Sequence, residues 1–247
     1  MNEGFRDLSE LREIVLRNKI PQHIAVIPDG NRRYARKYGL TIIEAYRRGV
    51  EKAKEFAEWC QDIGVKYLTF YSLSLENLQR RPREELNILF NLMRVYFREL
   101  IEDKRIHENE VRIRIVGRIN LLPRDLIDLI SKVERTTEEY ERYHITFLIA
   151  YSGRAEIVDA VKKILAETPY NHEITEDFFR KFLYLPDVPD PDLVIRTSGE
   201  QRISNFLLWY LAYSEFFFIK KYWPEITLED FLLVLREFQL RERRFGR

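Results

Sequence analysis

Residues 23–33 read HIAVIPDGNRR, and this stretch decides how the rest of the chain is interpreted. The apolar, β-branched run at 24–27 is typical of a short buried strand, which Pro28 ends because proline donates no ladder hydrogen bond. Residues 29–31 (Asp-Gly-Asn) then predict a turn at the carboxyl end of the strand, where open α/β sheets bind ligands. The carboxylate, the amide and the two arginines that follow suit a phosphorylated substrate with Mg²⁺, although a solvated strand-to-helix turn has the same composition.

The composition is that of a globular α/β protein. Its 247 residues are 45% hydrophobic and 33% charged, which is enough for a real core and a solvated surface. The formal net charge of +1 gives no global attraction to nucleic acid. The one cysteine, Cys60, excludes an internal disulfide and a cysteine-built metal site. The polar first residues and the lack of an apolar run of about 18 residues predict a cytoplasmic protein without signal peptide or membrane span.

Predicted strands alternate with predicted helices from end to end. We expect strands at 24–27, 65–71, 111–116, 144–150, 192–196 and 215–219, and helices at 8–19, 41–62, 83–104, 123–139, 155–167, 175–183 and after Thr227. Because such alternation is typical of βαβ units, the expected fold class is α/β: a single domain over 1–247, with a central, mostly parallel β-sheet surrounded by helices.

The predicted helix at 83–104 is apolar over much of its circumference. One stripe runs from Leu86 to Leu100, and a second runs from Ile88 to Tyr96. Packing between the sheet and another helix or subunit explains two apolar faces, and a helix that lines an apolar tunnel explains them as well.

Four predicted strand ends carry polar side chains. In a parallel sheet these ends face one way, so the side chains can converge on one cleft. We expect arginines there to hold a diphosphate and Asp29 and Glu215 to be the carboxylates best placed for Mg²⁺, although any one arginine alone is better explained by a structural ion pair. The four sets are Asp29-Gly30-Asn31-Arg32-Arg33, Ser74 with Glu76-Asn77, Ser152-Gly153-Arg154, and Arg196 with Arg202-Ile203-Ser204-Asn205.

Three segments resemble the cis-prenyltransferases, the family of undecaprenyl diphosphate synthase. They are 23–33, the stretch from Tyr71 to Asn77, and the long block DLVIRTSGEQRISNFLLW at 192–209. The resemblance runs from about residue 20 to the C-terminus. It implies a transferase that condenses isopentenyl diphosphate onto an allylic diphosphate, farnesyl or geranylgeranyl diphosphate, and forms a Z double bond at each step. The product would be a long-chain polyprenyl diphosphate, a precursor of a lipid carrier.

The resemblance also implies roles for individual residues. Asp29 would hold Mg²⁺ with the allylic diphosphate, and Glu215 would help to place the metal. The helix at 83–104 would wall the tunnel for the growing chain. The remaining roles are allylic diphosphate binding by Gly30, Asn31, Arg32 and Arg33, binding of the second diphosphate by Arg196, Arg202 and Ser204, positioning or proton removal by Ser74 and Asn77 with Arg80 or Arg81, and substrate binding by Glu76.

The resemblance further implies interactions beyond the two substrates. The tail Arg244-Phe245-Gly246 is similar to a C-terminal Arg-x-Gly that completes the site in a homodimer. The lipid product suggests peripheral contact with a membrane.

The sequence departs from the family pattern at several positions around the first turn and the second motif. We hypothesise that Arg32, Arg47 or Arg48 supplies charge lost at the substituted positions. The departures are Arg32 for Gly, Tyr34 for Trp, Ile42 for Arg, Tyr46 for His, Leu78 for Trp, Gln201 for His, and one extra residue around 79–81.

Two other functions are weighed against this interpretation. A non-catalytic subunit of a heteromeric prenyltransferase is disfavoured, because such subunits are expected to lose Asp29 and the arginines that are present here. A different Mg²⁺-dependent phosphate-ester enzyme would be inert towards isopentenyl diphosphate.

Overall fold

The structure is a computed structural model that describes residues 7–169 and 172–241. Its described strands form one six-stranded sheet in the order β3-β4-β2-β1-β5-β6. The chain separates into two compact units, the first formed by residues up to Leu68, Pro191–Gln201 and the chain from Tyr213, the second by Thr69–Asp190 and Arg202–Ala212. The predicted α/β class with a mostly parallel sheet is confirmed, whereas the single domain over 1–247 stays a prediction.

The first unit is organised by three parallel strands. β1 (His23–Ile27) is buried along its whole length and pairs with β5 (Leu193–Arg196), so that Ile27 lies opposite Arg196. β5 in turn pairs with β6 (Glu215–Phe218). The carboxyl ends of β1 and β5 therefore meet at the same edge.

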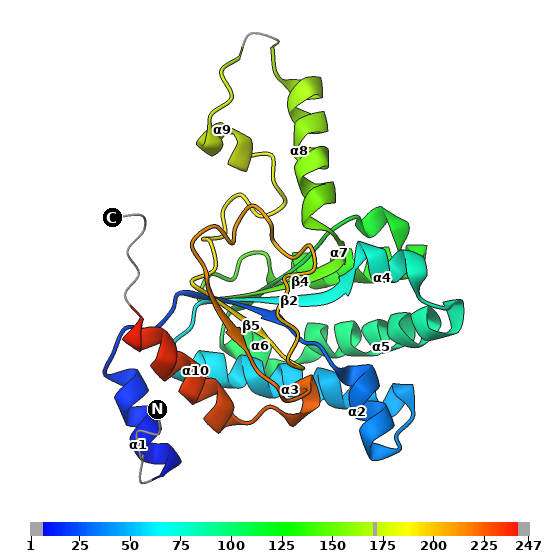
Figure 1. The fold of residues 1–247 in the computed structure, drawn as a ribbon. Coiled ribbons are helices and arrows are strands. Elements are labelled where there is room, and N and C mark those ends of the chain that lie inside the picture. The colour runs from blue at the N-terminus through cyan, green and yellow to red at the C-terminus, as the bar shows by residue number, and fades with distance from the viewer. Residues whose placement is uncertain (1–6, 170–171, 242–247) are drawn as a thin grey trace. The chain divides into compact units, whose positions relative to one another are not determined.

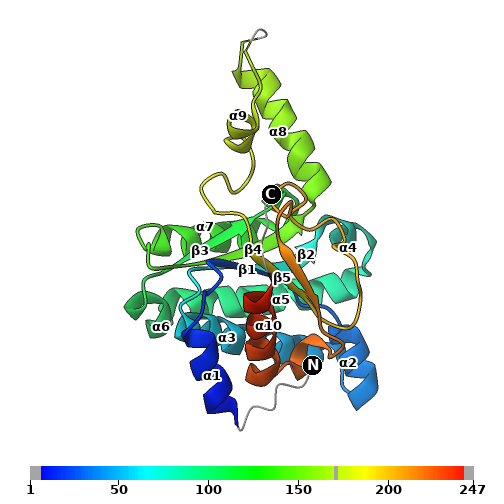
Figure 2. The same ribbon diagram turned by 60° about the vertical axis from the view of Figure 1, so that its left-hand side comes forward.

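In the described part of the first unit, four helices and a short 3₁₀ turn complete the fold. Figures 1 and 2 show α1 (Leu8–Leu16) and α10 (Leu228–Leu240) side by side. α2 (Asn31–Tyr38) follows β1, and α3 (Ile42–Ile63) begins with a capping box between Thr41 and Glu44. The 3₁₀ turn η2 (Trp223–Glu225) contributes Trp223, whose ring centroid lies 5.6 Å from that of Phe56 on α3.

The second unit is built around β3 (Val111–Val116) and β4 (Tyr143–Tyr151), which pair in parallel along β3. β2 (Tyr67–Ser74) begins in the first unit and enters the second at Thr69. α5 (Arg83–Glu102) packs against α7 (Arg124–Thr137), and both begin directly after a proline. Figure 2 shows α8 (Gly153–Glu167) beside α9 (Glu176–Arg180).

One face of α5 joins the core of the second unit. Phe90 and Phe97 are buried there with the apolar residues of β3 and α7. The other face is covered unevenly, since Leu92 is buried whereas Val95 remains 49% exposed. Core packing therefore explains the first apolar stripe, and the tunnel stays a prediction for the second.

Several predicted boundaries are wrong because polar residues start helices there. The strand expected to end at residue 71 continues to Ser74, and Ser74 then caps α4 (Leu75–Arg80). The helix expected at 83–104 ends at Glu102, and Asp103 then caps α6 (Lys104–Glu108). A 3₁₀ turn, η1 (Ile119–Leu121), precedes α7. Among the described residues, no helix is long and apolar enough to cross a membrane.

Candidate active site

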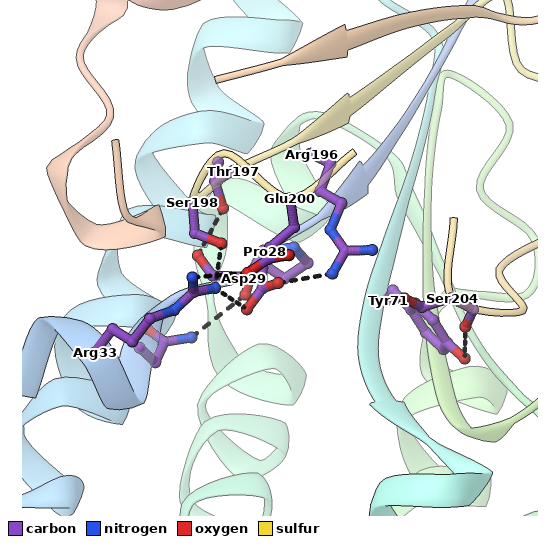
Figure 3. Close-up of polar contacts among 10 residues, drawn as sticks. Pro28, Asp29, Arg33, Tyr71, Arg196, Thr197, Ser198, Glu200 and Ser204 are labelled. Atoms are coloured by element: carbon purple, nitrogen blue, oxygen red, sulfur yellow. Dashed lines mark hydrogen bonds and ion pairs between the residues drawn. The ribbon is translucent and has the colours of Figure 1, made fainter. Parts of the chain in front are cut away.

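Asp29 and Arg196 meet because their strands are in register. Asp29 follows the last residue of β1 by two positions, and Arg196 is the last residue of β5. Asp29 Oδ2 accepts a hydrogen bond from Arg196 Nη2 at 2.8 Å, with the Asp29 side chain 28% exposed and the arginine side chain 5% exposed. The carboxylate is thus open to solvent on one side and paired with a buried cation on the other (Figure 3).

Arg33 approaches the same carboxylate from the start of α2. Its Nη2 lies 3.3 Å from Asp29 Oδ1 and 2.5 Å from Ser198 Oγ, and its Nη1 lies 2.9 Å from Glu200 Oε1. Figure 3 shows the guanidinium group between the turn after β1 and the turn after β5. Arg33 therefore joins two segments that are about 165 positions apart in the sequence.

The two arginines keep Asp29 ionised. Burial alone would raise the pKa of the Asp29 carboxyl, but the hydrogen bond and charge of Arg196 and the charge of Arg33 outweigh it and hold the pKa below the ordinary value of 3.8. At neutral pH the turn therefore presents one carboxylate between two guanidinium groups.

The backbone of the turn is fixed by close contacts around Gly30. Gly30 has a φ of +106°, and a Cβ atom there would lie 2.8 Å from Tyr222 Cδ1 and 3.0 Å from Ser198 Cβ. The main-chain oxygen of Asp29 accepts hydrogen bonds from Thr197 Oγ1 at 2.7 Å and from Trp223 N at 3.0 Å. Only glycine fits the position without a shift of its neighbours.

The N-terminus of α2 offers backbone donors beside these arginines. No side chain caps this helix at Gly30, and its first turn carries no acidic residue. Backbone N–H groups at such a helix start attract phosphate. Within this first turn the side-chain oxygen of Asn31 is buried without a hydrogen-bond partner, close to Gly49 of α3.

Glu215, the second carboxylate predicted to help place the metal, lies apart from Asp29. It pairs with Leu193 at the amino end of β6, whereas Arg196 pairs with Phe218 at the carboxyl end. The Glu215 carboxylate accepts from Arg241 Nη1 at 2.8 Å instead. The structure thus does not bring Glu215 to Asp29 within this chain, and the predicted tail residue Arg244 falls outside the described residues.

The arginines proposed to compensate for the departures have different surroundings. Arg32 is exposed on α2. Arg48 of α3 donates to the Tyr34 hydroxyl at 2.8 Å, which gives the tyrosine that replaces the family's Trp a polar partner.

The remaining predicted residues form a separate set in the second unit. The Ser74 hydroxyl accepts from Asn77 N at 3.0 Å, and Arg81 Nη1 lies 3.3 Å from Glu85 Oε1. Convergence of this set with Asp29 and Arg196 stays a prediction. By exposure, Asn77, Arg80, Arg202 and Ser204 are open to solvent, whereas Glu76 is partly buried.

Sequence reasoning missed three partners of the charged groups. Thr197, Ser198 and Glu200 fall within the block at 192–209 that carries the family resemblance, but no role was predicted for them. Ser198 adopts a φ of +71°, and its hydroxyl group meets Arg33. The run of small polar residues after a strand was the available signal.

Similarity to known proteins identifies the family of this chain. The family model described as putative undecaprenyl diphosphate synthase matches residues 27–246. A tritrans,polycis-undecaprenyl-diphosphate synthase (geranylgeranyl-diphosphate specific) of Methanopyrus kandleri is 50% identical over 241 residues, which cover 96% of this chain and 89% of the relative. A protein of the same name from Pyrococcus horikoshii is 47% identical over 241 residues, which cover 96% of this chain and 91% of that relative.

Solved structures agree with this assignment. Lavandulyl diphosphate synthase from Lavandula x intermedia, in complex with dimethylallyl diphosphate, superposes with a TM-score of 0.86 at 32% identity, covering 92% of this chain and 98% of that one. A probable undecaprenyl diphosphate synthase from Campylobacter jejuni has a TM-score of 0.78 at 30% identity, and the match covers 93% of this chain and 100% of that one. The predicted family and enzyme class are confirmed: the chain belongs to the undecaprenyl diphosphate synthase family of cis-prenyltransferases.

Proposed function

We propose that this protein condenses isopentenyl diphosphate onto geranylgeranyl diphosphate and extends it to a Z-polyprenyl diphosphate. The relatives from Methanopyrus kandleri and Pyrococcus horikoshii are both named as specific for that primer and cover 96% of the chain. The family model extends across both compact units, which supports one catalytic domain over 1–247.

The observation that carries this proposal is Asp29 held between Arg196 and Arg33. Both guanidinium groups are paired with carboxylates, and a diphosphate presents similar acceptor oxygens with more charge. The allylic diphosphate, bound at the start of α2, would take over Arg33, and the diphosphate of isopentenyl diphosphate would take over Arg196. The Asp29 carboxylate would then be left facing a cation.

The donor set fits Mg²⁺ bound through the substrate. Among residues 7–169 and 172–241, no group of three or more His, Cys, Asp or Glu side chains could hold a metal alone. Mg²⁺ commonly binds one or two carboxylates together with substrate phosphate oxygens, so Asp29 and a diphosphate are sufficient. The bound ion would neutralise charge that develops on the leaving diphosphate.

The chain's own groups then divide the reaction. Arg33, Gly30, Asn31 and the N-terminus of α2 hold the allylic diphosphate as it leaves. Arg196, Arg202 and Ser204 hold the isopentenyl diphosphate, so that its double bond attacks the allylic carbon. Asn77 and Ser74, with Arg80 or Arg81, orient that substrate while a proton is lost and the new double bond forms. Fixing the two substrates together supplies much of the rate enhancement.

The position of Glu215 supports a homodimer. Glu215 and Arg241 pair at the amino end of β6, and Arg241 directly precedes the C-terminal tail that carries Arg244. Because the register of the strands keeps Glu215 away from its own Asp29, a role in metal placement requires the site of a second copy. We propose that Glu215 and Arg244 act on that second site.

A long apolar product needs a protected path. The exposed part of the second stripe of α5, with Val95, supports a proposed wall for the growing chain. Release of such a product would bring the protein into peripheral contact with a membrane, and co-sedimentation with anionic lipid vesicles in the presence of product would test this contact.

Labelled isopentenyl diphosphate tests the whole proposal. The protein is incubated with geranylgeranyl, farnesyl or geranyl diphosphate, with Mg²⁺ or with a chelator, and the products are separated by thin-layer chromatography. We expect Mg²⁺-dependent elongation, fastest from geranylgeranyl diphosphate. Phosphatase activity without any elongated lipid would overturn the proposal.

A further inference from the structure

The turn that carries Ser204 adopts an unusual backbone. Ser204, Asn205 and Leu207 have φ values of +49°, +67° and +41°. Residues with a Cβ atom avoid this left-handed region, at a cost of roughly 1 kcal/mol or more each, although asparagine tolerates it better than most. Contacts from the surrounding chain must therefore hold the turn in place.

Asn205 makes most of these contacts. Its Nδ2 donates to Glu76 Oε1 at 2.7 Å and to Ser152 Oγ at 2.5 Å, while its Oδ1 accepts from Arg154 N at 3.0 Å. Its main-chain oxygen accepts from Gly153 N at 2.8 Å. Because the backbone N–H of Arg154 must meet an oxygen, the orientation of the amide is fixed and both of its N–H donors are engaged.

Glu76 connects this turn to α4. It is the second residue of the helix, between the Ser74 cap and Asn77, whose N–H group donates to the Ser74 hydroxyl. Partial burial works against ionisation, but hydrogen bonds from Asn205, from its own N–H group and from the hydroxyls of Ser74 and Ser152 hold the pKa of Glu76 below 4.5. The helix that carries Asn77 is thus tied to the turn that carries Ser204.

Tyr71 and Gly153 support the turn from other sides. The Tyr71 hydroxyl lies 3.3 Å from the main-chain oxygen of Ser204 (Figure 3), and its ring stacks on Phe206 with centroids 4.9 Å apart. A Cβ atom on Gly153 would lie only 2.9 Å from Leu208 N. The backbone of the turn therefore sits directly against the start of α8.

We propose that Glu76 and Asn205 are a positioning pair that locks the Ser204 turn to α4 and that neither side chain touches substrate. The inference rests on the proposed function, in which Ser204 holds the isopentenyl diphosphate and Ser74 and Asn77 orient that substrate. The pair keeps the two groups in one fixed geometry, because every donor of the Asn205 amide is already used within the protein.

Converting the Asn205 amide to an acid and the Glu76 acid to an amide, singly and together, tests the pair. Asn205→Asp sets two carboxylates against each other and should raise the KM for isopentenyl diphosphate on the order of tenfold to hundredfold. Glu76→Gln keeps an acceptor for Asn205 and should change the KM by less than about threefold. In the variant that combines both changes, the new amide at position 76 donates to the new carboxylate at position 205, and the KM should return close to that of the wild type.

Glu84→Gln, an exposed acid in the first turn of α5, is the matched control and should behave as the wild type. A Glu76 that binds substrate directly would give a different pattern. Glu76→Gln would then be as damaging as Asn205→Asp, and the double variant would be worse than either single one. That result would overturn the proposal.

Hydrogen–deuterium exchange without substrate separates this inference from the proposed activity. Glu76→Ala removes the acceptor and should speed exchange on the order of tenfold in the segment 203–208 of the full chain, with no change in Glu84→Gln. Unchanged exchange would overturn the positioning role even if the enzyme elongates lipids. Faster exchange in a protein that makes no polyprenyl product would instead leave the pair intact and refute only the proposed function.

Discussion

Two carboxylates that closely follow strands, one in each unit, have different partners and pKa values shifted in opposite directions. Asp29 follows β1 in the first unit and is paired with two guanidinium groups, which lower its pKa. Glu156 lies on α8 just after β4 in the second unit, is only 1% exposed, and accepts from neutral donors: the hydroxyls of Tyr151 and Tyr210 and the N–H group of Tyr184. Burial raises the pKa of Glu156, and those hydrogen bonds offset it only in part.

The difference separates a binding site from a structural network. Guanidinium groups around Asp29 can exchange a carboxylate for a phosphate, and the Asp29 side chain is 28% exposed, so a ligand can reach it. The donors around Glu156 come from three segments that the acid ties together, and the group has almost no contact with water. We therefore expect substitutions at Asp29 to affect turnover and substitutions at Glu156 to affect stability.

The largest expected effect is that of Asp29→Asn on turnover. The amide keeps an oxygen for Arg196 but loses the charge that a metal–diphosphate complex needs, so kcat should fall on the order of 10²- to 10³-fold. The assay follows incorporation of labelled isopentenyl diphosphate, and circular dichroism confirms folding. Glu200→Gln, an acid that meets the same Arg33, is the matched control and should lose less than about tenfold. Equal losses in the two variants would show that Asp29 has no special role.

Glu156→Ala should have the next largest effect, on stability. It leaves the hydroxyl groups of Tyr151 and Tyr210 and the backbone N–H of Tyr184 without their acceptor, which should lower the free energy of unfolding by about 3 kcal/mol. Urea unfolding measures the change. Glu156→Gln retains one acceptor oxygen and should cost less. A stable Glu156→Ala protein with normal urea dependence would contradict a structural role.

The sequence predicted the charged site better than the hydrogen-bonded one. Asp29 and Arg196 were predicted to meet because each lies at the carboxyl end of a short apolar strand, and parallel pairing brings such strand ends together. The prediction that Glu215 joins Asp29 is not met within this chain, because Glu215 begins its strand and therefore lies at the opposite end. Nothing in the pattern around Asn205 or Tyr210 predicts their acid partners, because these contacts depend on irregular turns whose backbone angles no periodicity encodes.

The two acids should also give opposite pH trends in stability. The pKa of Asp29 is lowered on folding, so its contribution is complete above the ordinary value of 3.8 and is lost as pH falls through the folded value. The pKa of Glu156 is raised on folding, so stability falls as pH rises from the ordinary value of 4.5 towards the folded one. Urea midpoints from acid to neutral pH, measured for the wild type, Asp29→Asn and Glu156→Gln, check both signs.

As pH rises through the window below 3.8, the stability of the wild type should therefore increase relative to that of Asp29→Asn. Above pH 4.5, the stability of the wild type should decrease relative to that of Glu156→Gln. Parallel trends in the two variants would mean that the guanidinium groups do not control Asp29.

The smallest expected effects come from single hydroxyl groups that support each acid. Thr197 is fully buried and donates to the main-chain oxygen of Asp29, but Trp223 N donates to the same oxygen. Thr197→Val should therefore lower the free energy of unfolding by only about 1 kcal/mol. Tyr210→Phe should lower it by about 2 kcal/mol, because its hydroxyl group both donates to Glu156 and accepts from Leu185 N.

Thermal and urea unfolding of these two variants measure whether the second unit depends more on its neutral donors than the first unit does. A larger loss of unfolding free energy in Thr197→Val than in Tyr210→Phe would reverse this comparison between the units. The turn at Asp29 would then depend on the Thr197 hydroxyl more than on Arg33 and Arg196. With the arginines in place, the carboxylate should stay ionised in Thr197→Val, so that turnover falls far less than in Asp29→Asn while stability falls slightly.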